Sequence, residues 1–382
     1  MGLFEWFGSF GSSALGYVIP FLFVLTIVVF FHELGHFLVA RWCGVDVKTF
    51  SVGFGPELFG FNDRKGTRWR LSAIPLGGYV RFAGDDNEAS AGSNSAALAE
   101  MTPEERSRTF AGKGVAARAA VVAAGPIANF ILAIAIFATI FTLYGRQVVS
   151  PQIDGVVAGS AAEAAGFQPG DTILSIDGTP ITSFNDLQRL VSISAGVDLS
   201  VLVRRGDDEV TLLVTPELKE LTDQFGNKQK VGVLGVSHST TGGGVTVERY
   251  APPQAVWIAT QETWFFASRT LSYLFQVVVG RESADQLGGP IRVATVSAQV
   301  ATLGFVALVN LAAILSISIG LINLFPIPML DGGHLLFYAV EAVRGKPLSE
   351  RVQELGFRIG FAAVLMLMIF ATWNDIIHLS SL

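Results

Sequence analysis

Charge and cysteine are scarce in this sequence. Only 15% of its 382 residues are charged, and the formal net charge of -6 is too small and too dispersed to indicate nucleic acid as a partner. Cys43 is the only cysteine, which excludes an intrachain disulfide bond. Hydrophobic residues make up 51% of the chain, and the mean hydropathy is +0.50. This balance is typical of a membrane protein that carries some soluble mass, and it indicates the lipid bilayer as a partner.

Four apolar runs are long enough to span a bilayer, which requires about 20 residues in a helix. They cover residues 17–40, 116–143, 305–325 and 357–377. Segments 1–40 and 359–382 contain no Lys or Arg, whereas basic residues flank the connection between the first two runs and the connection between the last two. Because basic residues favour the cytoplasmic side, we expect four crossings, with both ends of the chain and the long segment between the second and third runs outside the cytoplasm.

The first run contains the pentad His32-Glu33-Leu34-Gly35-His36. In a helix, His32 and His36 are four residues apart and share one face, so both imidazoles can bind one metal ion, with Glu33 beside them to handle a proton. Ionisable groups inside a membrane cost a few kcal/mol each unless they are paired or face a wet cavity. The pentad therefore predicts a functional metal site within the membrane.

The third run ends in Asn323-Leu-Phe-Pro-Ile-Pro-Met-Leu-Asp331-Gly-Gly-His334. Pro326 and Pro328 forbid regular helix there, and backbone left unpaired at membrane depth is tolerated only inside protein or beside water, which predicts a cavity. A catalytic zinc ion usually has three protein ligands, so the two histidines need one more. We expect Asp331 to be that ligand in preference to His334, because zinc would neutralise a carboxylate that is otherwise uncompensated beside Glu33.

The connection between the first two runs reads as β structure followed by a loop. Segments 50–56 and 69–82 alternate apolar residues with Gly and Pro, which predicts short bent strands in hairpins, either against the membrane face or as an ordinary cytoplasmic hairpin. Segment 85–103 has no periodicity and is expected to be a loop.

The second run contains Pro126 and Asn129, which indicate that this helix packs closely on other helices. A kink with interhelical hydrogen bonding is favoured over a direct role in the active site.

The long segment after the second run is different in character. Residues 153–216 show short strands, a Pro-Gly-Asp turn and two helices, an order that resembles a PDZ domain, whose groove binds peptides by strand addition. The alternative is a spacer or steric gate with an unused groove.

Residues 255–279 are predicted to form an apolar helix that is interrupted by Arg269. This helix is expected to lie on the outer membrane surface or against the spans rather than to cross the membrane.

These patterns predict a multi-span α-helical membrane protein with four transmembrane helices, membrane-associated β-hairpins and one extracytoplasmic PDZ-like α+β domain. The expected divisions are a first part of the membrane core at 1–145 with a cytoplasmic β-rich connection at 41–115, the PDZ-like domain at 150–235, an extracytoplasmic or interfacial helical region at 236–299, and a second part of the membrane core at 300–382.

The pentad, the motif Asn323-x-x-Pro326-x-Pro328-x-Leu330-Asp331-Gly332 and the PDZ-like insert resemble the site-2 protease family of intramembrane zinc metalloproteases, specifically the bacterial RseP type. The resemblance implies a bacterial inner-membrane location, His32, His36 and Asp331 as ligands of Zn²⁺, and Glu33 as the catalytic base. It also implies that Asn323, Pro326 and Pro328 handle substrate, and that Gly53-Phe54-Gly55 belongs to a membrane-associated β-element that guides substrate. One departure is that the family members of this type carry tandem PDZ domains, whereas here one copy is followed by an unassigned stretch, 217–250.

The implied activity is hydrolysis of peptide bonds within the transmembrane segment of single-span proteins, for example a pre-trimmed anti-sigma factor or a remnant signal peptide. One alternative is a membrane zinc transporter or sensor, but Glu33 is not needed for binding and suits hydrolysis. Another is a non-catalytic PDZ scaffold, for which a lost base or ligand is expected, and none of the motif residues is missing.

Overall fold

A computed structural model describes residues 14–84, 101–222, 228–238, 245–280, 284 and 288–380. The chain forms two compact units, one comprising Met1–Ala138 and Val256–Leu382, the other Thr139–Ala255. Most of the loop predicted at 85–103 lies outside the described residues. Where description resumes, Thr102 caps the short helix α4 (Pro103–Ser107) through a reciprocal capping box with Glu105.

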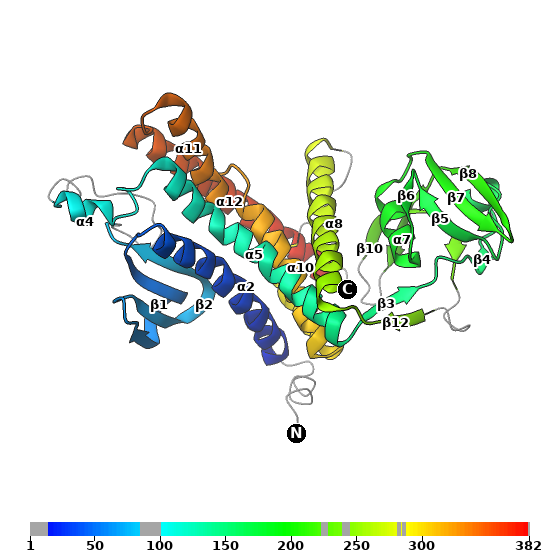
Figure 1. Ribbon diagram of the computed structural model, residues 1–382, viewed down its shortest axis with the longest axis horizontal. Coiled ribbons are helices and arrows are strands. Elements are labelled where there is room, and N and C mark those ends of the chain that lie inside the picture. Colours follow the sequence, from blue (N-terminus) through cyan, green and yellow to red (C-terminus); the bar gives the residue numbers. More distant parts are fainter. Residues whose placement is uncertain are drawn as a thin grey trace, which may run out of the picture. The chain divides into compact units, whose positions relative to one another are not determined.

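Among the residues that the structure describes, four helices are long and apolar enough to cross a membrane. They are α2 (Ala14–Trp42), α5 (Val115–Leu143), α10 (Phe305–Asn323) and α12 (Glu350–Ser380) (Figure 1). These helices contain the four predicted apolar runs, except that α10 ends at Asn323, two residues before the end of its run, where the Pro-containing loop begins. Four crossings with both chain ends outside the cytoplasm remain predictions.

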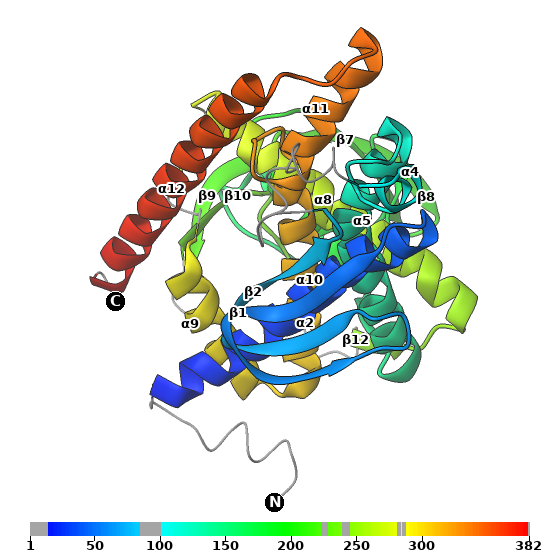
Figure 2. The same ribbon diagram turned by 90° about the vertical axis from the view of Figure 1, so that its left-hand side faces the viewer.

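The predicted bent strands are β1 (Val47–Asn62) and β2 (Arg68–Phe82), which form an antiparallel sheet against α2 (Figure 2). Each strand bends midway, so that Phe50 pairs with both Val80 and Trp69, and Trp69 pairs in turn with Phe61. The bends contain Gly53, Gly55 and Gly77, all with positive φ, a conformation that residues with a Cβ atom rarely adopt. The hairpin therefore curls into the equivalent of four short strands.

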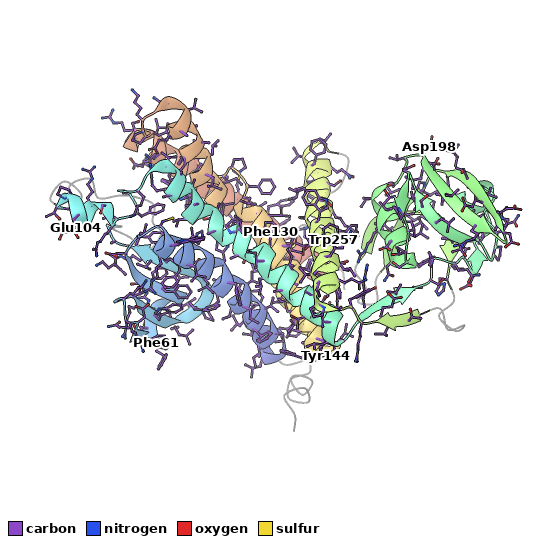
Figure 3. The ribbon with its side chains drawn as sticks, viewed as in Figure 1. Phe61, Glu104, Phe130, Tyr144, Asp198 and Trp257 are labelled. Atoms are coloured by element: carbon purple, nitrogen blue, oxygen red, sulfur yellow. The ribbon has the colours of Figure 1, made fainter. Side chains whose placement is uncertain are left out.

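The outer part of this curled sheet presents exposed apolar side chains. Leu58, Phe59 and Phe61 on β1 are more than half exposed, and Leu71 and Ile74 on β2 are about half exposed. Figure 3 labels Phe61 near the end of the hairpin. An apolar surface of this kind is typical of contact with lipid or with another protein.

Buried apolar clusters hold the first unit together. One joins Phe37 of α2, Phe50 of β1, Val80 of β2 and Val121 of α5. A second joins Val24 and Val28 of α2 to α9 (Pro290–Thr302) and α10. These clusters fix the middle of α2, which carries the pentad, between the β sheet and the neighbouring helices.

The start of α9 is fixed by the far end of α12. Gly289 precedes α9 and supplies no side-chain cap. Asp375 of α12 is buried and accepts hydrogen bonds from the backbone N–H groups of Gly289, Ile291 and Arg292 at 2.9, 3.1 and 3.0 Å. An acid inside an apolar helix is thus explained here by capping of another helix.

The apolar helix expected at 255–279 is α8 (Pro252–Val278). Ala259 and Ala267 are buried, Phe266 stacks on Phe137 of α5, and Trp257 and Trp264 are exposed, with Trp257 labelled in Figure 3. The helix therefore packs with one side on protein. Its position relative to the bilayer stays a prediction.

The second unit is a small α+β domain. Its four-stranded antiparallel sheet has the order β6-β5-β7-β8. The elements are β3 (Arg146–Val149), β4 (Gly155–Val156), α6 (Ala161–Ala164), β5 (Thr172–Ile176), β6 (Thr179–Pro180), α7 (Phe184–Ile193), β7 (Leu199–Arg205), β8 (Asp208–Val214), β9 (Glu217–Thr222), β10 (Lys228–Val233), β11 (Val236–Ser237) and β12 (Val245–Glu248). Ile173, Leu187 and Val201 lie in its buried core. The identity of this domain as a PDZ domain stays a prediction.

The stretch 217–250, unassigned from sequence, belongs to this second unit. β9 and β10 form a hairpin, β11 pairs with β4, and β12 pairs with β3. The predicted domain at 150–235 therefore falls inside a unit that also includes strands on both sides of it. β11 and β12 are short and pair with strands far away in the chain, so the local sequence carries no clear pattern for them.

Candidate metal centre

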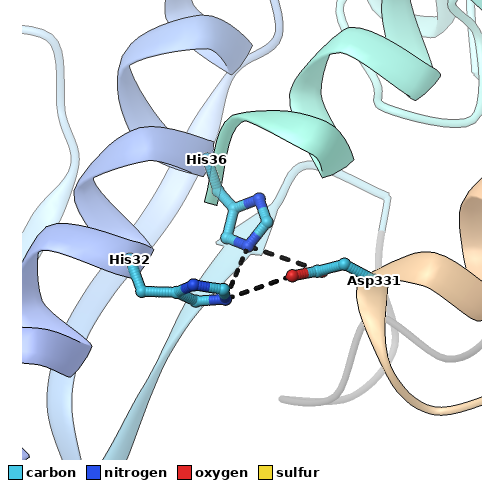
Figure 4. A group of neighbouring side chains, drawn as sticks. All are labelled: His32, His36 and Asp331. Carbon is cyan, nitrogen blue, oxygen red and sulfur yellow. Dashed lines mark hydrogen bonds and ion pairs between the residues drawn. The ribbon is translucent and has the colours of Figure 1, made fainter. Parts of the chain in front are cut away.

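The two histidines of the pentad lie on one face of α2, with Nε2 of His32 3.3 Å from Nε2 of His36 (Figure 4). Nδ1 of His36 lies 2.9 Å from the backbone oxygen of Val121 on α5. Because a carbonyl oxygen only accepts hydrogen bonds, Nδ1 carries the proton and Nε2 of His36 keeps a free lone pair. That lone pair points into the space shared with His32.

Asp331 comes to the same place from the other end of the chain. Its Oδ2 lies 3.1 Å from His32 Nε2, and its Oδ1 lies 3.5 Å from His36 Nε2. Asp331 is the first residue of α11 (Asp331–Arg344) and follows the non-helical loop that contains Pro326 and Pro328.

The loop before Asp331 is tight. Met329 has φ +92°, an uncommon conformation for a residue other than glycine that costs on the order of 1–3 kcal/mol. A Cβ atom on Gly332 would collide with the backbone oxygens of Leu324 and Phe325, so glycine after Asp331 lets α11 begin directly against the loop. Backbone packing thus fixes where the Asp331 carboxylate lies.

The three side chains fit a zinc ion. Taking one ligand atom from each, all lie within 4.8 Å of one another. Tetrahedral zinc with bonds of about 2.0–2.1 Å separates its ligand atoms by about 3.3–3.4 Å, close to the 3.1, 3.3 and 3.5 Å found here. Oδ2 of Asp331 is buried and makes no hydrogen bond of normal geometry with the described residues. A bound cation would stabilise this arrangement, in which the histidine nitrogens and an unsatisfied carboxylate oxygen point toward one another.

A cavity of about 350 Å³ opens at this cluster. Glu33, Asn323, Phe54 and His334 line it together with the two histidines and Asp331. Glu33, Asn323 and Phe54, which the sequence analysis assigned to the site, therefore line one cavity in the structure. Gly53, Gly55, Pro326 and Pro328 are not among the lining residues; they belong to the strand bend and to the loop that carry Phe54 and Asp331.

Two residues of α5, Gly125 and Asn129, contact the histidines. A Cβ atom on Gly125 would collide with Nε2 of His36 and lie 2.9 Å from Cε1 of His32, so only glycine leaves room for the two imidazoles. The side-chain amide nitrogen of Asn129 lies 3.2 Å from Nδ1 of His32. The sequence favoured interhelical hydrogen bonding for Asn129 without naming His32 as its partner. It gave Gly125 no role, although a glycine and a polar residue four apart in an apolar helix indicate close packing on another helix.

The model of Peptidase family M50, the site-2 protease family, matches residues 20–367. The chain belongs to this family. Its members are zinc metalloproteases of the membrane, so this protein is a zinc metalloprotease and zinc is its cofactor.

Curated relatives agree over nearly the full length. A protein of Agrobacterium fabrum is 52% identical over 361 residues, covering 94% of this chain and 96% of the relative. A protein of Rhizobium meliloti is 53% identical over 363 residues, covering 95% and 97%. Both have "zinc metalloprotease" in their names. Metalloprotease MmpA of Caulobacter vibrioides is 42% identical over 382 residues, covering 94% and 95%.

Proposed function

We propose that this M50 protease hydrolyses peptide bonds within the transmembrane segments of single-span membrane proteins, in the manner of the RseP type. The observation that carries the proposal is the convergence of His32, His36 and Asp331 beside Glu33, in a cavity bounded by apolar helices long enough to cross a membrane. Hydrolysis at membrane depth needs such a water-accessible polar pocket, because lipid alone would supply neither water nor a stable place for charge.

We assign His32, His36 and Asp331 as the zinc ligands. They supply two neutral nitrogens and one carboxylate, a donor set common in zinc hydrolases. When bound, zinc supplies a Lewis acid and brings the pKa of a hydrolytic water to about 7. The carboxylate of Asp331 also compensates part of the cation's charge in surroundings where a bare charge is costly.

Glu33 is the proposed general base. It is the residue next to His32, lines the same cavity, and is absent from the cluster of ligand atoms. It would take a proton from the attacking water and return it to the amine of the leaving peptide. Asn323, at the cavity wall, would hydrogen-bond either the substrate backbone or the developing oxyanion.

A helical substrate must be unwound locally before attack, since its carbonyl groups are occupied by hydrogen bonds within the helix. Two elements beside the cavity have backbone that departs from regular structure: the bend of β1 at Gly53-Phe54-Gly55 and the loop with Pro326 and Pro328. We propose that they receive the extended substrate segment as an added strand. The exposed apolar side chains on the outer part of the hairpin support a place for it at the membrane face.

We further propose the bacterial cytoplasmic membrane as the location, with both chain ends and the second unit outside the cytoplasm, as the distribution of Lys and Arg favours. The second unit would then be a PDZ-like domain that binds a peptide or limits access of untrimmed proteins. Substrates of this kind include an anti-sigma factor already cut outside the membrane and a remnant signal peptide.

The test is co-expression with candidate single-span proteins whose extracytoplasmic parts have been removed. Wild-type protein is expected to produce a cut inside the span that a zinc chelator abolishes and that Glu33→Gln does not produce. A cut that persists in Glu33→Gln and in the presence of chelator, or one that maps outside the span, contradicts the proposal.

A further inference from the structure

The Asn129 side chain is fully buried and contacts the metal centre from behind. Its amide nitrogen lies 3.2 Å from Nδ1 of His32, and its amide oxygen, Oδ1, is buried without a hydrogen-bond partner among the described residues. His32 turns its other nitrogen, Nε2, toward His36 and Asp331. Asn129 thus occupies the side of the His32 ring that faces away from the proposed ligand cluster.

The chemistry of a ligating imidazole decides which end of the Asn129 amide belongs at His32. A histidine that binds a metal through Nε2 is neutral and carries its single proton on Nδ1. An N–H group at Nδ1 needs an acceptor, which the amide nitrogen of Asn129 is not. A half-turn of the amide exchanges nitrogen and oxygen, and the otherwise unpartnered oxygen then accepts the proton of Nδ1.

We propose that Asn129 is a positioning residue that accepts a hydrogen bond from Nδ1–H of His32. It thereby fixes the tautomer and ring orientation that leave the Nε2 lone pair free for zinc. This inference rests on the proposed role of His32 as a ligand. Metal-binding histidines usually donate a hydrogen bond from their other ring nitrogen to such an acceptor, and loss of the acceptor typically weakens metal affinity by about 10–100-fold.

The same helix performs the equivalent task for the other histidine. The backbone oxygen of Val121 accepts from Nδ1 of His36 at 2.9 Å. Val121 and Asn129 both belong to α5, so one helix orients both imidazoles of α2, once through its backbone and once through a side chain. The backbone contact is insensitive to side-chain identity, whereas the contact to His32 requires an acceptor at position 129.

Helix α10 packs against α5 at the level of Asn129. The hydroxyl of buried Ser316 donates to the backbone oxygen of Asn129 at 2.9 Å. A Cβ atom on Gly320 would lie 3.2 Å from Cβ of Asn129, so the two helices are in close contact at this level. Ser316 therefore provides a matched control: it is buried, belongs to the same contact and touches the backbone of Asn129 but not His32.

The test measures zinc dissociation constants by chelator competition on the full-length protein in detergent, without any assay of proteolysis. Asn129→Leu, which keeps the size of the side chain but has no acceptor, is expected to bind zinc about 10–100-fold more weakly. Asn129→Asp keeps an acceptor oxygen and is expected to stay within about threefold of wild type or bind more tightly, since carboxylates are common partners of zinc-binding histidines. Ser316→Ala is expected to bind as wild type does.

Unfolding midpoints measured with excess chelator show whether each variant folds. If Asn129→Leu does not fold, Asn129→Ala is used as the acceptor-free variant in its place. Wild-type affinity in the acceptor-free variant, or an equal loss in Asn129→Asp or in Ser316→Ala, overturns the inference. His32→Ala separates this failure from failure of the metal site itself. If His32→Ala binds zinc as tightly as wild type, the proposed ligand set is wrong, whereas loss in His32→Ala without loss in Asn129→Leu rejects only the role of Asn129.

Discussion

Gly125 of α5 lies directly against the His36 ring of α2. Any Cβ atom at position 125 would collide with Nε2 of His36, the atom that faces Asp331. Glycine is unfavourable in a helix by about 1 kcal/mol relative to alanine, so its presence here trades helix propensity for space at the metal centre.

Gly125→Ala is therefore expected to lower zinc affinity at least about tenfold, even though alanine favours the helix, because His36 must move away from the ligand position. Gly114→Ala, just before the same helix, is the control, since a Cβ atom there meets nothing within 4 Å. Zinc titration of both variants checks the expectation. Equal affinities in the two would show that the contact at Gly125 is not restrictive.

The sequence predicted the long helices and the pairing of His32 with His36 because their signals are local. A run of about 20 apolar residues indicates a span, and two histidines four apart share a helix face whatever the rest of the chain does. The link from α2 to Asp331 rested on chemical need and on resemblance, since nothing local relates residues about 300 positions apart.

What the sequence did not predict depends on contacts between distant segments. The acceptor for His36 is the backbone oxygen of Val121, which carries no side-chain signal at all. For Asn129, a kink with interhelical hydrogen bonding was favoured over a role in the site, and the structure has an interhelical hydrogen bond whose partner is His32. Bent strands were predicted from Gly and Pro in β1 and β2, but their double pairing, in which Phe50 pairs with both Val80 and Trp69, was not, because periodicity alone does not give the register.

Asp375→Ala is expected to destabilise the protein by about 2–4 kcal/mol, because it leaves the N–H groups of Gly289, Ile291 and Arg292 without their acceptor. Asp375→Asn retains one acceptor oxygen and is expected to lose less. Ile369→Ala, at a largely exposed position of the same helix, serves as control with a change of about 0.5 kcal/mol or less. Unfolding of the detergent-solubilised protein measures all three. Equal stabilities of Asp375→Ala and the control would argue against the cap.

Asp63 holds the β1–β2 turn to the end of α2, where Arg41 donates to its carboxylate. Burial opposes its ionisation, but the Trp69 indole, the backbone N–H groups of Thr67 and Lys65, and Arg41 outweigh this and lower the pKa of Asp63 from 3.8 to about 2. A carboxyl group with a lowered folded-state pKa stabilises the fold above its unfolded pKa, and that stability is lost as the pH falls toward the folded value.

Asp63→Asn should therefore be less stable than wild type at pH 7, and the difference should shrink between about pH 4 and pH 2. Unfolding midpoints of the two proteins at pH 7, 4, 3 and 2.5 test this directly. A stability difference that is the same at all four values would mean that the charge of Asp63 contributes nothing.

Helix-breaking residues in the target span are expected to favour cleavage. A substrate helix must open before its carbonyl groups can be attacked, and Gly or Pro lowers the cost of opening by about 1–3 kcal/mol relative to a good helix former. Replacing such residues by Leu in a co-expressed single-span substrate should slow the cut by about tenfold or more. Equal cleavage rates of the two substrates would refute the need for local unwinding.

We infer that His32, His36 and Asp331 would hold one zinc ion and that Glu33 would take the proton of the attacking water. The most direct measurement is the zinc content of purified wild-type, Asp331→Ala and Glu33→Gln protein. Wild type and Glu33→Gln are expected to contain about one zinc per chain, and Asp331→Ala almost none. Full zinc content in Asp331→Ala would contradict it, because the carboxylate that lies 3.1 Å from His32 would then not be a ligand.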